Sequence, residues 1–157
     1  MESGTRKIAR VTDRGCLLYS GLAADSRVLA RKAVDIALEY RMKFGETAKL
    51  PVEILVSKIA MMMQEYTQIG GVRPFGTSLL MASIDVDGPR LYKLEPSGSF
   101  SAWKSVAIGE GSVAAEALLH EGYEESMDRD RALELLLIVL KKSSGARRGE
   151  VETAFLE

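Results

Sequence analysis

The chain has 157 residues, of which 46% are apolar, and this length and composition suit one domain with a hydrophobic core. Its formal net charge is −1 and its basic residues are scattered among acidic ones, which argues against a nucleic-acid or anionic-membrane binder, since phosphate groups are bound by clustered Lys and Arg. A single cysteine, Cys16, excludes an intramolecular disulfide framework and a multi-cysteine zinc site, and it fits a reducing compartment. Because no signal-peptide core and no apolar run of about 18 residues occur, we expect a soluble intracellular protein.

The first elements along the chain are predicted to be a pair of strands. Short runs of β-favouring residues span 7–12 and 16–20, and the Asp-Arg-Gly sequence at 13–15 is a turn signal between them. Since so short a connection reverses the chain, the two runs are expected to pair in opposite directions.

Two amphipathic helices are predicted next. The first can be capped by Asp25 or Ser26 and ends near Gly45, and the second opens at Pro51, which suits the first turn of a helix. Apolar residues recur at helical spacing in both segments, so each helix has one face for a core. These residues are Leu29, Ala33, Ile36, Ala37 and Tyr40 in the first helix and Leu55, Ile59, Met62, Met63 and Tyr66 in the second.

Three strands in a meander are predicted after the second helix. Residues 77–84 are almost continuously apolar, which is typical of a central strand covered on both faces. The Asp-Gly pair at 87–88 predicts a hairpin turn into a strand over 90–94. The Pro-Ser-Gly sequence at 96–98 predicts another turn, into a strand over 100–108.

The last third of the chain is predicted to be helical, with one closing strand. A short helix is expected over about 112–121, and a longer one over about 130–142 is followed by Gly145. Residues 150–156 have the composition of a strand. Strands and helices that follow each other in sequential pairs favour an α+β layered sandwich, and we find no repeat, low-complexity tract or linker, so 1–157 is expected to be one domain.

One motif suggests a nucleotide site. Residues 109–114, from Gly109 to Ala114, spell G-x-G-x-x-A between a predicted strand and a predicted helix, which is the setting of a dinucleotide-binding loop. The parallel strand and ribose-binding carboxylate expected about 20 residues later are absent, because that region is predicted to be helix. We therefore favour a strand-to-helix turn in which glycine permits close packing, and keep a nucleotide-binding enzyme as the alternative function.

No other residues form a recognisable reactive site. The only histidine, His120, lies near the end of a short predicted helix, which is more typical of a solvated surface position than of a catalytic triad. The methionines at 61–63 favour core filling over an adaptable binding surface, and Lys141 and Lys142 suit the C-terminal charge of a helix. From residue chemistry alone we expect no catalytic residue, metal site or cofactor.

The strongest pattern is the stretch 64–76, Q-E-Y-T-Q-I-G-G-V-R-P-F-G, which reads as a helix end, a tight loop and a strand start. Gly70 and Gly71 supply backbone freedom, and Pro74 prevents the helix from continuing. The stretch resembles the Y-T-Q-x-G-G-V-R-P-[FY]-G signature of the alpha-type subunits of the 20S proteasome. The resemblance covers nearly the whole chain, through further matches in order and spacing at 6–8, 20–22, 24–29, 87–89, 91–92, 96–98, 102–104 and 108–109.

This resemblance implies the four-layer α-β-β-α sandwich of the N-terminal nucleophile hydrolases, in its inactive branch. Alpha-type subunits form the seven-membered outer rings, gate the axial pore and dock activators, whereas beta subunits cut peptides in ubiquitin-dependent degradation in cytoplasm and nucleus. Gly4-Thr5 resembles the processing junction of a catalytic beta subunit. Because residues 6–10 lack the acidic partner and buried lysine of that machinery, a catalytic Thr5 is not expected.

The resemblance also assigns two sites. Lys7 matches the lysine that accepts the C-terminal carboxylate of an activator tail between neighbouring alpha subunits, and Leu22 matches a wall of the same pocket. The residues Ile69, Gly70, Gly71 and Val72 match the loop that narrows the axial channel. Family members begin upstream of the Lys7 match with a gating segment, an axial helix and two strands, so we expect an N-terminally truncated form of the sandwich.

Overall fold

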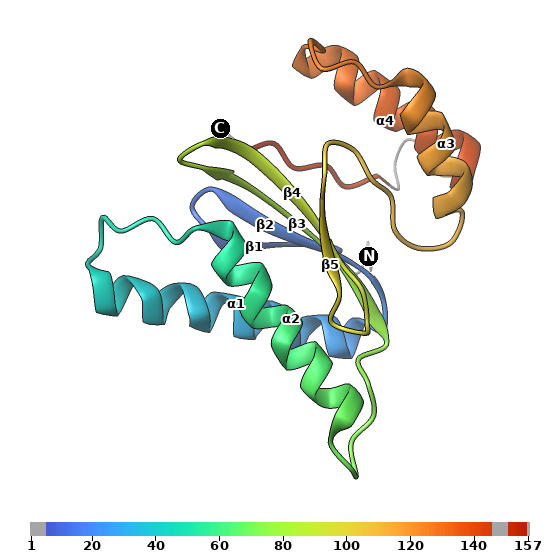
Figure 1. The fold of residues 1–157 in the computed structure, drawn as a ribbon. Coiled ribbons are helices and arrows are strands. Elements are labelled where there is room, and N and C mark those ends of the chain that lie inside the picture. Colours follow the sequence, from blue (N-terminus) through green and yellow to red (C-terminus); the bar gives the residue numbers. More distant parts are fainter. Residues whose placement is uncertain (1–5, 146–150, 157) are drawn as a thin grey trace, which may run out of the picture.

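The computed structural model describes residues 6–145 and 151–156 and has an antiparallel sheet at its centre (Figure 1). Within these residues the sheet has five strands in the order β1-β2-β3-β4-β5, so each strand pairs with its neighbour in sequence. The strand pair and the meander that the turn signals predicted are confirmed. The strands are β1 (Ile8–Thr12), β2 (Gly15–Gly21), β3 (Thr77–Asp85), β4 (Gly88–Leu94) and β5 (Phe100–Trp103).

Two pairs of helices lie on opposite sides of this sheet (Figure 1). Helices α1 (Ala23–Phe44) and α2 (Val52–Gln68) cover one face, and α3 (Ser112–Gly122) and α4 (Arg129–Ser144) pair with each other on the other side. The fold is thus α+β, as predicted, and the described residues supply one sheet of the four-layer arrangement that the resemblance implies. None of the described helices is both long and apolar enough to cross a membrane.

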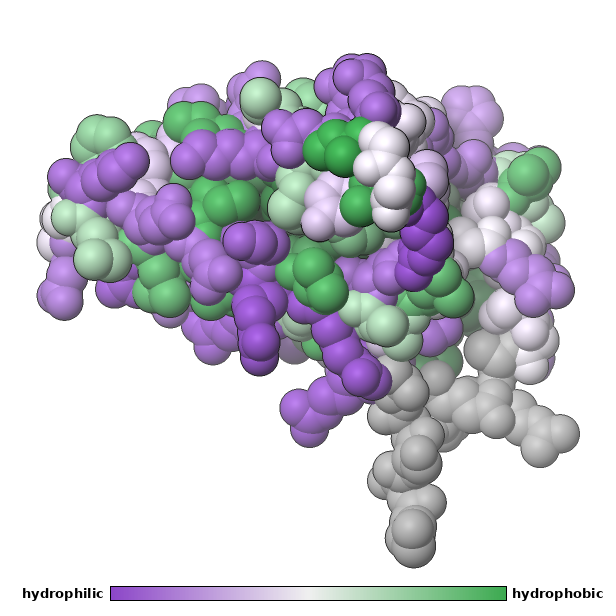
Figure 2. All heavy atoms as spheres, turned by 90° about the horizontal axis from the view of Figure 1, so that it is seen from below, coloured by the Kyte–Doolittle hydropathy of each residue, from purple (hydrophilic) through white to green (hydrophobic). Residues whose placement is uncertain are grey.

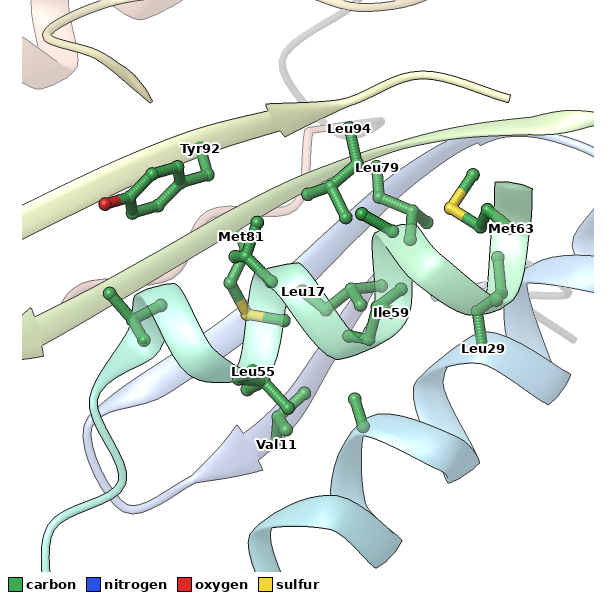
Figure 3. Close-up of a cluster of buried hydrophobic side chains, with 14 of the residues drawn as sticks. Val11, Leu17, Leu29, Leu55, Ile59, Met63, Leu79, Met81, Tyr92 and Leu94 are labelled. Carbon is green, nitrogen blue, oxygen red and sulfur yellow. The ribbon is translucent and has the colours of Figure 1, made fainter. Parts of the chain in front are cut away.

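The main core fills the space between the sheet and α1 and α2 (Figure 3). On β3 the burial alternates, because Leu79 and Met81 point to the helices and their neighbours point to the other face. Helix α2 contributes Ile59 and Met63, which are fully buried, as the 3.6-residue period predicted. The buried residues of this cluster are Val11, Leu17, Leu29, Ala33, Val52, Leu55, Val56, Ile59, Ala60, Met63, Phe75, Leu79, Met81, Tyr92 and Leu94.

The outer surfaces of α1 and α2 complete the amphipathic pattern. Figure 2 shows the molecule from below Figure 1, where hydrophilic side chains cover much of the surface and apolar ones lie between them. Of the three successive methionines in α2, Met63 is buried in the core whereas Met61 is exposed. The predicted core role therefore holds for Met63 and is wrong for Met61, because α2 presents the two positions to different sides.

A second, smaller cluster joins α3 to α4. Its buried residues are Ala115, Leu119 and Val139, with Leu135 packed against them. Glycine brings the two helices close together at Gly111, where an added Cβ would lie 2.7 Å from the Ser143 carbonyl oxygen. The prediction that β3 is covered on both faces is therefore only half right, because this pair packs mainly on itself and leaves residues such as Leu80 half-buried on the second face.

The start of α1 differs from the sequence prediction. The helix begins at Ala23, so Asp25 and Ser26 lie inside its first turn and neither caps it. Leu22 is the N-cap residue and makes no side-chain capping bond. Both polar side chains have partners after α2, Asp25 in the loop before β3 and Ser26 at the first residue of β3, and these tertiary bonds replace the local cap.

Two predicted strand boundaries are also wrong. Strand β5 ends at Trp103 rather than near residue 108, because the chain leaves the sheet there to reach α3 and Lys104 pairs with Glu125 beyond that helix. Residues 151–156 form no strand; Glu150 lies outside the described residues. This segment is held by side chains instead, since the Glu152 carboxylate accepts a hydrogen bond from the Lys7 backbone N–H (2.9 Å) and the Arg129 guanidinium lies 3.9 Å from the centre of the Phe155 ring.

Candidate functional site

The candidate site lies at the end of the sheet where β2 ends and β3 begins. Gly21 pairs with Thr77, and the Leu22 N–H donates to the Gly76 carbonyl (2.9 Å). The start of α1 and the loop after α2 are therefore side by side, although about 50 residues separate them in sequence. An added Cβ at Gly21 would lie 2.3 Å from the Gly76 carbonyl oxygen, so this close approach requires glycine.

The glycine loop projects from this end into solvent (Figure 1). Helix α2 stops at Gln68, and the Ile69 N–H makes the last helical bond, to the Glu65 carbonyl (3.0 Å). Gly71 then has a φ of 86°, a left-handed conformation that favours glycine. Ile69 and Val72 are exposed on either side of the two glycines. The predicted helix end, tight loop and strand start are confirmed, and the assignment of residues 69–72 to an axial channel stays a prediction.

One ion pair holds the base of this loop. The Arg73 guanidinium donates to both carboxylate oxygens of Asp25, from Nη1 at 2.6 Å and from Nη2 at 2.8 Å. The Gly76 backbone N–H donates to the same carboxylate at 2.9 Å. Asp25 is almost completely buried while Arg73 is largely exposed, so the arginine shields the carboxylate from water. A bidentate Arg–carboxylate pair is both strong and directional, and it locks the loop onto the first turn of α1.

The electrostatics of Asp25 agree with this geometry. The hydrogen bonds from Arg73, and then that from the Gly76 N–H, lower the pKa of the Asp25 carboxyl from 3.8 to about 2, against the opposing effect of burial. The same pairing raises the pKa of Arg73. Both groups are therefore charged at neutral pH, and the pair is ionised there.

A hydroxyl pair lies beside the ion pair. Ser26 Oγ and Thr77 Oγ1 are 2.9 Å apart and almost inaccessible to solvent. The Ser26 hydroxyl also donates to the Leu22 carbonyl at 3.0 Å. These bonds satisfy the two buried hydroxyls and connect α1 to the first residue of β3, so the loop is fixed at its junction with the sheet as well as at Arg73.

The structure places Lys7 and Leu22 at this same end of the sheet. Lys7 precedes β1 and its carbonyl accepts a hydrogen bond from the Tyr19 N–H (3.3 Å), which puts it opposite the last residues of β2. Leu22 is exposed, and its side chain packs over Gly76, where an added Cβ would be 2.7 Å from Leu22 Cδ1. The exposure suits a pocket wall, and the carboxylate-binding role of Lys7 stays a prediction.

The other candidates do not form a reactive site. Gly109 and Gly111 both have positive φ, and an added Cβ at Gly109 would lie 2.5 Å from Ser20 Oγ. Gly109 serves close packing next to the antiparallel sheet and Gly111 serves close packing against α4, which is the interpretation favoured from the sequence over a nucleotide loop. His120 is exposed in the last turn of α3, as predicted, and Thr5 lies outside the described residues.

Sequence patterns missed the two residues that organise the site. The sequence predicts Asp25 or Ser26 as a helix cap and indicates no role for Arg73. One signal for the pairing was available. A chain that turns from helix to strand leaves backbone N–H groups that need an acceptor. Asp25 is an acidic residue, and it lies in a stretch that matches the family. Nothing local in the sequence indicates that the acceptor lies 48 residues before Arg73.

Comparison with known proteins gives a consistent result. A family model described as "Proteasome subunit" matches residues 1–154. The chain is 42% identical over 140 residues to "Proteasome subunit alpha type-2" of Dictyostelium discoideum, covering 89% of this chain and 60% of that protein. It is 40% identical over 156 residues to "Proteasome subunit alpha type-2-A" of Arabidopsis thaliana, covering 99% of this chain and 64% of that protein.

These matches also indicate which type of alpha subunit the chain resembles. The sequence combination at 19–21, 63–68 and 100–104 most resembles the eukaryotic alpha type 2 subunit, and the alpha type-2 protein of Caenorhabditis elegans is likewise 43% identical over 144 residues. The chain spans about three fifths of the length of the curated relatives it matches. The matching family model, the signature loop and the fold all agree. This chain therefore belongs to the proteasome subunit family.

Proposed function

We propose that this chain is a non-catalytic subunit of the outer alpha ring of a 20S proteasome core. The observation that carries the proposal is the exposed loop 69–72, fixed at its base by the Asp25–Arg73 pair and lying at the same end of the sheet as Lys7 and Leu22. Family membership and the likeness to alpha type-2 subunits support it. In this role the chain contributes to ubiquitin-dependent protein degradation in cytoplasm and nucleus.

The loop is proposed to narrow the axial channel of the ring. A Cβ added at Gly70 or at Gly71 would have no neighbouring atom within 4 Å, so both residues face open space. Small residues at such a tip let copies of the loop from several subunits approach one another. The arginine anchor keeps the tip in place while its backbone stays accessible, which a constriction requires.

Lys7 is proposed to accept the terminal carboxylate of an activator tail in a pocket shared with a neighbouring alpha subunit. An ammonium group aimed at a carboxylate forms a charge-assisted hydrogen bond. The exposed Leu22 side chain supplies an apolar wall at the same end of the sheet. The partners in this proposal are other alpha subunits, beta subunits and the C-terminal tails of activators or of the regulatory particle.

Assembly can be tested by native mass spectrometry. The chain is mixed or co-expressed with the other alpha subunits, and the masses of the complexes are measured with and without it. A ring subunit is expected to enter complexes that contain one copy per ring. If the chain stays separate from every other alpha subunit under conditions in which those subunits assemble, the proposed ring function is wrong.

In an assembled particle, Thr5→Ala is expected to leave every peptidase activity unchanged.

Activator docking can be tested at Lys7. In reconstituted particles, Lys7→Ala is expected to weaken binding of an activator's C-terminal peptide by roughly 1.5–3 kcal/mol, the usual contribution of a hydrogen bond to a charged group. Lys32→Ala is the matched control, because Lys32 is an exposed lysine on the surface of α1. Lys7→Arg keeps the charge and is expected to restore part of the affinity. Equal affinities for Lys7→Ala and the parent would contradict the assignment of Lys7 while leaving the ring assignment open to the assembly experiment.

A further inference from the structure

Helix α4 ends in an exposed serine that follows two lysines. Ser144 is the last residue of the helix, and Lys141 and Lys142 stand three and two positions before it. All three side chains are exposed. Protein kinases that select basic substrates carry acidic side chains for positive charges at these two positions, so charge complementarity brings such a segment to the active site in one register. The end of α4 therefore has the charge pattern of a kinase substrate.

The last turn of α4 can open at little cost. Phosphoryl transfer requires the serine hydroxyl in line with the γ-phosphate of ATP, so the hydrogen bond from Ser144 Oγ to the Leu140 carbonyl (2.8 Å) has to break. This bond lies at the surface, where water replaces the lost partner. Residues 141–145 have no apolar side chain, and Val139 is the buried residue of the helix that precedes them. Opening this turn therefore withdraws no apolar side chain from the small cluster between α3 and α4.

The neighbouring serine is a poorer acceptor. Ser143 is half-buried, and its hydroxyl donates to the Val139 carbonyl (2.8 Å). Its own carbonyl oxygen lies where α3 begins, 2.7 Å from the position of a Cβ added at Gly111. Figure 1 shows α3 and α4 side by side in this pair. The residue three positions before Ser143 is Leu140, so of the two serines Ser144 alone combines an exposed side chain with both lysines in register.

The other hydroxyl groups of the described chain have a different setting. Within residues 6–145 and 151–156, Ser144 is the one serine or threonine with basic residues both three and two positions before it. Thr12 comes nearest, with Arg10 two positions before it. It lies in β1, however, and its hydroxyl oxygen accepts a hydrogen bond from the Arg14 N–H (3.3 Å). The acceptor is therefore specified by its place in the fold as well as by charge.

We propose that Ser144 is a phosphorylation site for a protein kinase that selects basic residues before its acceptor, and that the phosphate loosens the end of α4. In the transfer, Ser144 Oγ attacks the γ-phosphorus of ATP. The new Oγ–P bond forms while the bond from this phosphorus to the oxygen that bridges the β- and γ-phosphates breaks, and ADP leaves. The hydroxyl proton goes to the catalytic aspartate of the kinase.

The expected effect on the structure follows from the position of the phosphate. A phosphoserine adds a charge of about −1.5 to −2 at neutral pH. The carbonyl end of a helix already carries a partial negative charge, so a phosphate on Ser144 destabilises the last turn, and the two lysines offset only part of this effect. Because the Ser143 carbonyl packs against Gly111, opening of the turn also loosens the start of α3.

The proposal can be tested with the purified full chain, ATP and the catalytic subunit of cAMP-dependent protein kinase, which selects basic substrates. Tandem mass spectrometry is expected to locate one added phosphate, at Ser144. Casein kinase 2, which selects acidic substrates, is expected to modify Ser144 at least about tenfold more slowly, because its own charges repel the two lysines' acidic counterparts but not the lysines' role as its preferred ligands is absent. A Leu-Arg-Arg-Ala-Ser-Leu-Gly peptide serves as the positive control for the first kinase.

Variants of the full chain provide matched controls. Ser144→Ala is expected to abolish the modification and Ser143→Ala to retain it. The double variant Lys141→Gln, Lys142→Gln is expected to lower the rate at least about tenfold, since glutamine keeps the helix propensity of lysine and removes its charge. Lys32→Gln makes the same change at an exposed position on α1 and is expected to alter the rate less than about twofold.

Hydrogen exchange measures the effect of the phosphate. Faster exchange is expected at the end of α4 and the start of α3, with the sheet unchanged, and phosphatase treatment is expected to restore the original rates. The proposal is overturned if Ser144 stays unmodified while the control peptide is phosphorylated, if Ser143 is modified equally fast, or if the double lysine variant reacts like the parent. Unchanged exchange in a chain that is fully phosphorylated at Ser144 would overturn the proposed loosening of α4.

Discussion

Two regions of the molecule contain similar apolar side chains but bury them to different extents. The first region is the sheet with α1 and α2, and the second is the α3–α4 pair. Among the described residues, the first region has a cluster of fifteen buried residues and the second has three. Residues 135–140 of α4 are six successive apolar residues, yet only Val139 of them is buried, and Leu136 and Ile138 are 46% and 42% exposed. Apolar sequence therefore creates a core only where a second layer covers it.

The α3–α4 pair is joined to the sheet by polar links. Lys93 on β4 lies 3.3 Å from Glu116 on α3, and Lys104 after β5 pairs with Glu125. The first pair is partly buried and the second is exposed, and an exposed ion pair contributes only about 0–1 kcal/mol, which is much less than a buried apolar cluster. We therefore expect two regions of unequal stability, with α3 and α4 opening before the sheet.

The largest expected effect is that of Ile59→Ala. Ile59 is fully buried between α2 and the sheet, and truncation of such a side chain costs roughly 2–5 kcal/mol through lost burial and the cavity that remains. The measurement is urea unfolding followed by far-UV circular dichroism, with hydrogen exchange to locate the change. Faster exchange is expected throughout the sheet, α1 and α2.

Leu119→Ala is the comparison for Ile59→Ala. Leu119 is buried in the small cluster, so its truncation is expected to accelerate exchange in α3 and α4 and to leave the sheet almost unchanged. If both variants destabilised the whole molecule equally, the two regions would form one cooperative unit and the proposed difference between them would be wrong.

The next effect concerns Asp25, which joins α1 to the glycine loop. Asp25→Asn is expected to cost about 1–3 kcal/mol, because the Arg73 guanidinium and the Gly76 N–H lose a charged acceptor. Asp87→Asn is the matched control, since Asp87 is exposed and lies 3.9 Å from Arg90. The unfolding free energies of the two variants decide the comparison.

The pH dependence gives an independent check on Asp25. Its folded pKa of about 2 is below the reference value of 3.8, so the ionised carboxylate stabilises the fold fully above pH 4. That contribution is lost as the pH falls from about 4 to about 2. The stability difference between the parent and Asp25→Asn is therefore expected to shrink over this window, and a difference that stays constant down to pH 2 would contradict the assigned pKa.

Local sequence signals predicted most of the fold. The turns at 13–15, 87–88 and 96–98 predicted three of the four antiparallel strand pairs of the described sheet, and the 3.6-residue period located α1 and α2. The errors occurred where tertiary contacts override local preference. Strand β5 is shorter than its sequence indicates because the chain turns to α3, and residues 151–156 are held by Glu152 and Phe155 rather than by a ladder.

The site was less predictable than the fold. The loop at 69–72 was located from its glycines and Pro74, since backbone freedom is a local property. The bond between Asp25 and Arg73 connects residues that are 48 positions apart, and its acceptor resembled an ordinary helix cap.

A comparable effect, confined to the α3–α4 pair, is expected at Gly111. Gly111 has a φ of 77° and an added Cβ would lie 2.7 Å from the Ser143 carbonyl oxygen, so Gly111→Ala combines backbone strain with a steric clash and is expected to cost roughly 1–3 kcal/mol. Gly145→Ala is the control, because Gly145 has a φ of 66° with no atom within 4 Å. Hydrogen exchange in α3 and α4 measures the difference, and equal effects would show that contact with Ser143 is unimportant.

The smallest expected effect is at the exposed side of α4. Leu136→Gln and Ile138→Gln replace side chains that contact solvent, and glutamine has a helix propensity similar to that of leucine, so each change is expected to alter the unfolding free energy by less than about 0.5 kcal/mol. Val139→Gln, one position further along, places an amide in the small cluster and is expected to cost roughly 1–3 kcal/mol. Urea unfolding of the three variants, with sedimentation to record the oligomeric state, makes the comparison. A loss of about 2 kcal/mol or more in the exposed variants would mean that another surface covers this side of α4 in solution, because a solvated leucine has no burial energy to lose.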